Sequence, residues 1–515
     1  MLARIGRSYP APAAARPRAL RVRNEAAYIG ATTGRRARGW SAPTVGANDA
    51  VLWALSLLRA RSRAAVRSDG YARMGVERLV SNIVGSGIAP QSKAPDRDFR
   101  KRLHELFLDW TDEADATGQL DFYGLQAQAV QAWLEGCESF TRQRPRLADD
   151  VQFVPLQLQL IESEQCPVDH TMLNARTGNR IRAGVEFSAI GRRVAYWLYR
   201  ERPGDPQDLN TADLVRVDAA QVQHLYAPLR PGQIRGLPQL TQALLVLHET
   251  AKWRDATQVR QAMSAMFLMF LKRAAPLGDP ELNPTTGQPV ERDPADDTPL
   301  MPMEPALVQE LEPDETVEFS DPPEASGYAD FMRDTLMEAA VAAGVPYEVL
   351  TGDLRNVNDR TVRVILNEFR RRIEQYQHHI VAFQFNRPIW AAFINRAILS
   401  GALVPPSEFF RDPLPYYRVE WVPPAWPYLN PVQDVQAYKA MVRAGAMTLD
   451  EFIREVRGRS LDEVAHERAD ELALLAELGI VTDTDPAKVS NAGLTQTRPP
   501  GSELPEENLT GGAME

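Results

Sequence analysis

The 515-residue sequence predicts an α+β fold, and three observations support this class. From residue 358 to residue 387, apolar side chains recur every three or four positions, which is the spacing of one face of a long helix. Between residues 151 and 226 the pattern changes to short alternating runs that are typical of strands. Two further helical patterns flank an acidic, proline-rich insertion at residues 274–325.

Composition limits the class of protein. With 44% hydrophobic residues in 57.5 kDa, the chain has enough apolar material and length for about three domains. Cys137 and Cys166 are too few for a disulfide framework and lack the spacing of a zinc site, which fits a reducing cytoplasm. The longest apolar run, near residues 265–271, is far shorter than the roughly 20 residues of a membrane-spanning helix. We therefore expect a folded, soluble protein with no membrane partner.

The net charge of −10 is unevenly distributed along the chain. The first 40 residues are rich in arginine and contain a single acid, Glu25. This composition is typical either of an organelle transit peptide or of a disordered arm that orders against nucleic acid or a neighbouring subunit. No later pattern is typical of an organellar enzyme, so we favour the arm.

The opposite charge gathers in the insertion at residues 274–325, where Arg292 is the one base among many acids. Prolines from Pro276 to Pro323 exclude a continuous helix, and only residues 306–319 could form short strands. By itself this pattern indicates a solvated insertion. Its aspartates at 293, 296 and 297 lack the glycine and terminal glutamate of a calcium loop, so we predict no metal site.

The helices on either side of the insertion define its ends. The upstream helix begins after Pro238 and keeps its apolar spacing to about residue 270, a length approaching 50 Å at 1.5 Å per residue. Its apolar face, including Leu244 and Leu247, needs a partner, and we expect a neighbouring subunit to supply it. Its methionine-rich end is typical of adaptable core. The downstream helix, 327–343, ends at Gly344 as a C-cap.

The remaining elements follow from the same two periodicities. We predict the following helices and strands: helices at 49–66, 71–84, 97–110 and 123–138; strands at 151–161, 181–187, 194–199 and 222–226, with a hairpin turn at Gly191; a strand at 419–422; and helices at 432–444, 449–456 and 461–478. Thr448 and Ser460 are the expected caps of the last two helices.

The long helix is preceded by a loop from Gly344 to residue 357 and spans about 45 Å from Asn358 to Arg387. Pro388 should bend or end it, because proline has no backbone N–H to donate. A rod of this length suits a ring of subunits better than it suits an enzyme core.

Motifs for catalysis or cofactor binding are missing from the sequence. It contains no GxxxxGK[ST], HExxH or GxSxG pattern, and we predict no enzyme activity and no cofactor. The Gly85-Ser86-Gly87 run follows a helical pattern and lacks a third glycine, which favours a loop over a dinucleotide site. The adjacent His378 and His379 do not share one helix face, so they indicate packing or surface positions and not a metal pair.

Several segments together are specific enough to suggest a family. They are SNIVGSGIAPQ from Ser81, GNRIRAGVEF and GRRVAYWLY between residues 178 and 199, PLRPGQIRGLP from Pro228, and GVPYEVLTGD from Gly344. In these segments the chain resembles the lambda-type family of bacteriophage portal proteins. The resemblance implies this division: basic N-terminal arm 1–48, wing domain (first part) 49–230, first stem helix 231–273, acidic clip 274–325, second stem helix 326–350, tunnel-like loop 351–358, long kinked helix and wing (second part) 359–425, helical crown 426–482, and disordered tail 483–515.

The resemblance also implies a function. Portal proteins form a ring of twelve subunits at one capsid vertex, through which terminase drives double-stranded DNA inward and from which DNA later leaves. The implied partners are other copies of the chain, double-stranded DNA without sequence specificity, the terminase large subunit, and capsid and head-completion proteins. The implied location is the virion, after assembly in the host cytoplasm. A ring of 12 × −10 = −120 formal charges would repel phosphates and let DNA slide.

Two sets of residues are the expected contacts. The implied DNA-channel candidates are Arg355 and Asp353 in the tunnel-like loop, and Lys272 and Arg273 at the end of the first stem helix. The implied terminase-docking candidates are Glu310, Glu312, Asp314 and Glu315 in the clip. An alternative for Arg355 is that it pairs with Asp353 or Asp359 and only shapes the turn.

Two other classes of function stay open from sequence alone. One is a helical adaptor or tail-assembly protein without a DNA channel, and the other is a nucleic-acid enzyme with an unrecognised site. The enzyme would need titratable residues gathered in a cleft, and the sequence shows none at a recognisable spacing.

Overall fold

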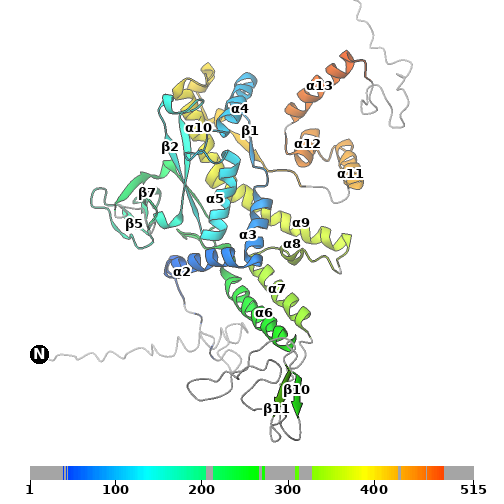
Figure 1. Cartoon of the computed structure of the whole chain (residues 1–515). Helices are drawn as coiled ribbons and strands as arrows, with labels where there is room; N and C mark the ends of the chain where they lie inside the picture. The colour runs from blue at the N-terminus through cyan, green and yellow to red at the C-terminus, as the bar shows by residue number, and fades with distance from the viewer. Residues whose placement is uncertain are drawn as a thin grey trace, which may run out of the picture.

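The computed structural model describes residues 44–203, 213–265, 269–272, 308–311, 327–355, 357–426, 431–459 and 461–480, with Gly39 and Ala42. Most of the predicted arm, most of the predicted clip, the cap Ser460 and all of the predicted tail lie outside these residues. The fold is mixed, with helices around small sheets, as the sequence predicts (Figure 1).

Four helices from the first third of the chain confirm the predicted pattern. They are α2 (Ala47–Ser68), α3 (Gly70–Ile83), α4 (Arg97–Thr111) and α5 (Phe122–Gly136). An aspartate caps three of them, because the side chains of Asp69, Asp96 and Asp121 accept amide hydrogen bonds from the first turns of α3, α4 and α5. The apolar faces of α3, α4 and α5 meet in the main core, where large aromatic rings such as Phe107 and Trp110 are fully buried, and Val51 and Leu55 of α2 form a smaller cluster with Cys137.

The strands form three small sheets in this body. A three-stranded sheet has the order β3-β2-β9, built from β2 (Ser139–Pro145), β3 (Leu156–Ile161) and β9 (Val222–Leu225). A five-stranded sheet runs in chain order from β4 to β8, and its strands are β4 (Met172–Leu173), β5 (Arg180–Arg182), β6 (Val185–Phe187), β7 (Arg193–Tyr199) and β8 (Leu214–Asp218). The third sheet pairs β1 (Ala89–Ser92) with β12 (Val419–Val422).

Two predicted strands are shorter than expected. The strand predicted from residue 151 begins only at Leu156, because the Glu113 carboxylate accepts the amides of residues 152–154 at 2.8–3.0 Å and holds them off the sheet. The strand predicted over 181–187 is broken at Ala183 and Gly184, which both have positive φ and form a tight turn between β5 and β6. The hairpin of β6 and β7 around Gly191 is confirmed.

The long helix is confirmed, but it does not end at Pro388. It consists of α9 (Asp359–Gln375), a π-helical segment (Tyr376–Asn386) and α10 (Arg387–Ser400). Pro388 lies in the first turn of α10, where a missing N–H is tolerated because the hydrogen-bond pattern changes at that point. Figure 1 shows α9 and α10 pointing in different directions, so the bend lies in the π-helical segment.

The helix predicted after Pro238 is shorter than expected. A 3₁₀ turn precedes α6 (Leu244–Ala265), and β10 (Met269–Lys272) replaces the last predicted turns. The reason is tertiary pairing, because β10 hydrogen-bonds in parallel with β11 (Val308–Leu311), the strand predicted inside the insertion. The second helix, α7 (Tyr328–Ala343), ends at a left-handed Gly344 as predicted.

Two more regions complete the described chain. The loop predicted after Gly344 contains a short helix, α8 (Tyr347–Thr351), which begins just after Pro346. The three predicted C-terminal helices are confirmed as α11 (Pro431–Arg443), α12 (Leu449–Arg457) and α13 (Leu461–Glu477). Thr448 and Glu451 form the expected capping box at the start of α12.

Candidate functional site

Helices α6 and α7 form an antiparallel pair that projects from the body (Figure 1). At the body end, the Gln239 side-chain amide donates to the carbonyl oxygen of Ala343 at 2.8 Å. Further out, the Trp253 ring stacks on Tyr328 with centroids 4.9 Å apart, and it also packs on Phe331. These contacts fix the level of each residue on α6 relative to α7.

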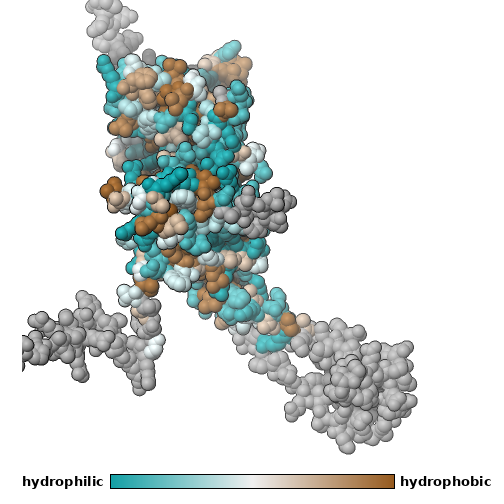
Figure 2. Space-filling view, turned by 90° about the vertical axis from the view of Figure 1, so that its left-hand side faces the viewer, coloured by the Kyte–Doolittle hydropathy of each residue, from teal (hydrophilic) through white to brown (hydrophobic). Residues whose placement is uncertain are grey.

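The apolar face of α6 is divided between the core and the surface. Leu247 is buried and Leu244 is half-buried in the chain's own core, so the expectation that both face a neighbouring subunit is wrong. Other large apolar side chains are exposed along the pair, among them Leu245, Val259, Met337 and Val341. Figure 2 shows the pair as a narrow arm below the body, with apolar patches among polar ones.

A buried ionic cluster lies where the chain leaves the body for α6. Arg235 donates from Nε to both carboxylate oxygens of Glu138, at 2.8 and 2.9 Å, and its Nη2 also contacts that carboxylate. Nη1 donates to the carbonyl oxygens of Cys166 and Ala183. Both side chains of the pair are fully buried. Arg235 therefore joins both larger sheets to the segment that leads into the α6–α7 pair.

His224 completes this cluster from β9. Its Nε2 lies 2.9 Å from Glu138 Oε2, so a neutral ring donates to an ionised carboxylate. Burial lowers the pKa of His224 to about 4, despite the opposing effect of Glu138. Although burial opposes ionisation of Glu138, Arg235 and His224 together hold its pKa well below the usual range.

The sequence pattern does not indicate this cluster. It places Glu138 at the end of a helix, but α5 ends at Gly136 and Cys137 takes a positive φ of 86° that turns the chain into β2. Arg235 lies within the PLRPGQIRGLP segment, yet nothing in its spacing indicates a partner 97 residues earlier. Burial raises the pKa values of the neighbouring cysteines, that of Cys166 to about 11, so both stay as thiols.

The loop after α8, predicted to be tunnel-like, carries a second arginine–carboxylate pair. Arg355 donates from Nε and Nη2 to the two oxygens of Asp353, each at 2.8 Å, and its backbone amide also donates to Asp353. Tyr347 on α8 donates to the same carboxylate at 3.2 Å. The hydrogen bonds from Arg355 lower the pKa of Asp353. The structure thus shows the pairing given as the alternative for Arg355, while its side chain stays 81% exposed.

Two of the other predicted contact residues lie in the small sheet beyond the α6–α7 pair (Figure 1). Lys272 is in β10 and Glu310 is in β11, and their backbones are one register position apart, because Lys272 is opposite Leu311 and Glu310 is opposite Leu271. The two-stranded sheet therefore brings one DNA-channel candidate beside one docking candidate. Of the remaining six candidates, Asp353 and Arg355 lie apart in the loop after α8, and four lie outside the described residues. Those outside are Arg273, Glu312, Asp314 and Glu315.

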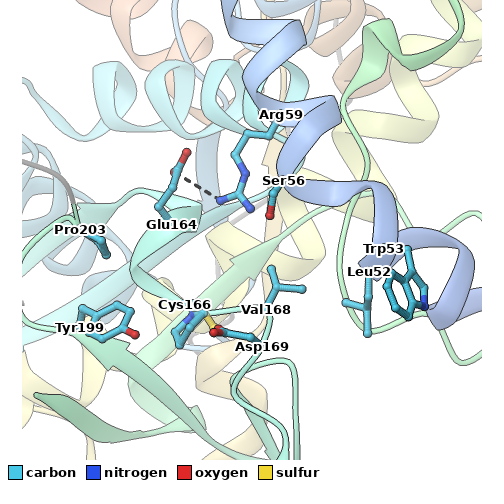
Figure 3. Close-up of a pocket in the computed structure, with 11 residues that line it drawn as sticks. Leu52, Trp53, Ser56, Arg59, Glu164, Cys166, Val168, Asp169, Tyr199 and Pro203 are labelled. Atoms are coloured by element: carbon cyan, nitrogen blue, oxygen red, sulfur yellow. Dashed lines mark ion pairs between the residues drawn. The ribbon is translucent and has the colours of Figure 1, made fainter. Parts of the chain in front are cut away.

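The described part of the chain offers no candidate metal centre. No group of three or more potential metal ligands occurs in it, and His378 and His379 are exposed. A cleft of about 760 Å³ lies between α2 and the loop after β3 (Figure 3). Arg59 on α2 forms an ion pair with Glu164 at 3.4 Å in the lining of this cleft, and Arg63 contacts the same carboxylate at 2.5 Å. None of the described helices has the length and apolarity needed to cross a membrane.

Comparison with known proteins decides the family. The family model described as phage portal protein, lambda family, matches residues 33–377. The chain belongs to this family. The probable portal protein of Halomonas phage phiHAP-1 is 25% identical to this chain over 475 residues. The match covers 88% of this chain and 87% of the relative.

The solved structures that resemble this chain share a lower sequence identity with it. The neck of an empty GTA particle, computed with C6 symmetry, is 14% identical with a TM-score of 0.39, and the match covers 76% of this chain and 91% of the other. The virion of a native gene transfer agent (GTA) particle is also 14% identical, with a TM-score of 0.37 and coverages of 84% and 98%.

Family membership confirms the resemblance seen in the sequence, and it indicates where the protein is located. It is a structural protein of the phage capsid, of the portal type and α+β class, and DNA packaging and head–tail connection follow from the family.

Proposed function

We propose that the chain forms a closed ring of twelve subunits at one capsid vertex, with the α6–α7 pairs as its stem. The observation that carries the proposal is the projecting helix pair, which exposes large apolar side chains on both of its helices. A surface of this kind on a protein of this family needs a partner, and other copies of the chain supply it in a ring.

The ring encloses a channel through which double-stranded DNA enters during packaging and leaves during ejection. The net charge of −10 per subunit keeps the phosphate backbone from sticking to the wall. Arg355, which is ion-paired with Asp353 but highly exposed, offers each subunit one weak and sequence-independent phosphate contact. Lys272 and Arg273 are the second candidate ring of cations, at the far end of the stem.

The acidic clip is the docking surface for the terminase large subunit. Glu310 lies on β11 beyond the stem, and Glu312, Asp314 and Glu315 follow it in the sequence. A concentration of acids at the tip of a projection raises the association rate of a partner with a basic face. Capsid and head-completion proteins contact the ring elsewhere, first in the host cytoplasm during assembly.

An in vitro packaging assay tests this function. Heads assembled with the portal chain should protect DNA from nuclease when terminase and ATP are supplied, and heads assembled without it should protect none. Changing Glu310, Glu312, Asp314 and Glu315 together to Gln should weaken terminase binding and flatten its salt dependence while rings still form. Equal packaging with and without the chain would refute the proposal that it forms the DNA channel. Unchanged packaging by the quadruple variant would show that terminase docks elsewhere.

A further inference from the structure

One end of the five-stranded sheet presents a basic and aliphatic surface. The β4–β5 loop and the β6–β7 turn both lie at this end, because neighbouring strands of the sheet are antiparallel. Arg176 lies in the loop, Arg180 is the first residue of β5, and Arg192 lies in the turn. All three side chains are exposed. Together with Leu173 and Ile190, these arginines form what we call the sheet-end surface.

The two aliphatic side chains extend this surface beside the charges. Leu173 is opposite Arg180 in the pairing of β4 with β5, so both side chains lie on one face of the sheet. Ile190 lies in the same turn as Arg192. The exposed fractions of Leu173 and Ile190 are 67% and 88%. Arginine beside exposed apolar side chains is typical of a surface that contacts another protein.

The positive charge of the sheet-end surface is not balanced within the sheet. None of its three guanidinium groups forms an ion pair with another described residue. The one acid between residues 171 and 192 is Glu186, which is buried and paired with Arg216 at 2.9 Å. Asp218 ends β8 at the same end of the sheet, so arginines still outnumber the exposed acids there. In a chain of net charge −10, this local excess of positive charge is available to a partner.

Hydrogen bonds fix the two turns that carry the arginines. The buried Glu186 carboxylate accepts from three side chains of the β4–β5 loop, those of Asn174, Thr177 and Asn179. In the β6–β7 turn, the Ser188 amide donates to the carbonyl oxygen of Arg192 at 2.8 Å. A surface whose backbone is already ordered loses little conformational entropy on binding, which favours affinity.

The five-stranded sheet lies on the opposite side of the body from the crown helices. In Figure 1, β5 and β7 are at the left of the body, whereas α9 and α11 to α13 are at the right. Figure 2 views the molecule from that left-hand side and shows apolar patches among polar ones at the level of the body. A partner at the sheet end therefore leaves the loop before α9 accessible.

We propose that the sheet-end surface docks an acidic segment of another protein, one that carries aliphatic side chains among its carboxylates. Each guanidinium can donate two parallel hydrogen bonds to a carboxylate, and the charges raise the association rate. Leu173 and Ile190 favour a protein over DNA, because a phosphate backbone offers them no apolar contact. Docking itself does not depend on the proposed ring, but a location on the outside of that ring does.

Peptide binding to the purified full-length chain tests this inference. The probe is a short fluorescent peptide of glutamate and leucine, and fluorescence anisotropy measures its dissociation constant at low salt. Replacing Arg176, Arg180 and Arg192 together with Gln should weaken binding about tenfold. Circular dichroism shows whether this sheet-end variant is folded, and Arg176→Glu alone provides a second test if it is not.

A matched control and an apolar variant make the test specific. Arg78→Gln, Arg102→Gln and Arg411→Gln together remove the same charge from exposed positions outside the sheet, and this control should bind the peptide as the wild type does. Leu173→Ser with Ile190→Ser should weaken binding of the glutamate–leucine peptide about threefold. The same change should leave binding of a peptide of glutamate alone unaffected.

The outcomes separate an acidic protein partner from other occupants. No binding by the wild type, or an equal loss in the control and the sheet-end variant, would refute the proposal. A duplex DNA probe that binds more tightly than the peptide, and is weakened by the same variant, would assign the surface to nucleic acid. Loss of rings by that variant in mass photometry would assign it to a second copy of the chain. If the wild type binds the peptide but forms no rings, the proposed function fails and the docking surface stands.

Discussion

Two arginine–carboxylate pairs in this protein share a bidentate geometry but differ in burial. One pair is fully buried, and the arginine of the other is largely exposed to solvent. Arg235 and Glu138 form a bidentate pair whose side chains are both 0% exposed. Arg355 and Asp353 form a bidentate pair whose side chains are 81% and 16% exposed. The first holds the segment that leads into the α6–α7 pair, and the second lies on a loop that we assign to the channel wall.

The difference in burial gives the pairs different roles. Around Arg235, the carbonyl oxygens of Cys166 and Ala183 and the ring of Phe140 complete a closed environment, so the guanidinium has no alternative partner. Around Arg355, water competes for every hydrogen bond, and a passing phosphate could replace the carboxylate. The buried pair is suited to hold a joint, and the exposed pair is suited to exchange partners.

The largest expected effect comes from breaking the buried pair. Arg235→Met should lower the free energy of unfolding by about 3–5 kcal/mol, because Glu138 would remain buried without its main counter-charge. Urea denaturation of the isolated subunit measures the loss. The double variant Arg235→Met with Glu138→Leu should be more stable than Arg235→Met alone. A double variant that is less stable than the single variant would contradict the explanation that the unpaired, buried carboxylate of Glu138 causes the loss of stability.

A pH effect at His224 should be smaller. Its folded-state pKa of about 4 lies below the usual 6.5, so its stabilising contribution is complete above pH 6.5 and is lost as the pH falls toward 4. Between pH 7 and pH 5 the loss should be about 2 kcal/mol, at 1.36 kcal/mol per pKa unit. His224→Gln should be less sensitive to pH over this range in urea denaturation. An identical pH dependence in wild type and variant would exclude His224 as its source.

Breaking the exposed pair should leave the fold intact and affect DNA instead. Arg355→Ala should not change the free energy of unfolding measurably, since its side chain is open to water. Heads made with it should retain packaged DNA less well at low salt. Arg371→Ala, which removes another exposed arginine paired with an acid, is the control. Normal retention by Arg355→Ala at every salt concentration would leave Arg355 with only its turn-shaping role.

The smallest expected effect comes from loosening the exposed pair without removing its cation. Asp353→Asn removes the negative partner and leaves the guanidinium of Arg355 available to phosphate. Packaging should slow slightly, with a steeper dependence on salt concentration than in the wild type. A faster rate or an unchanged salt dependence would argue that Arg355 does not contact DNA.

The sequence predicted most helices because each depends on local periodicity and caps. The helix from residue 97 and the cap at Thr448 are examples. Features that depend on distant partners could not be predicted in the same way. Residues 152–154 leave the sheet because of Glu113, and Met269–Lys272 become a strand because of residues 308–311. Arg235 and Glu138 find each other only through the fold, so periodicity gives no sign of their pairing.

The most direct test of the portal account is to image and weigh the purified protein. Negative-stain electron microscopy should show closed rings with a central hole, and mass photometry should give about 690 kDa, which is 12 × 57.5 kDa. Monomers, open filaments or compact particles without a hole would contradict the proposed channel and favour an adaptor role instead.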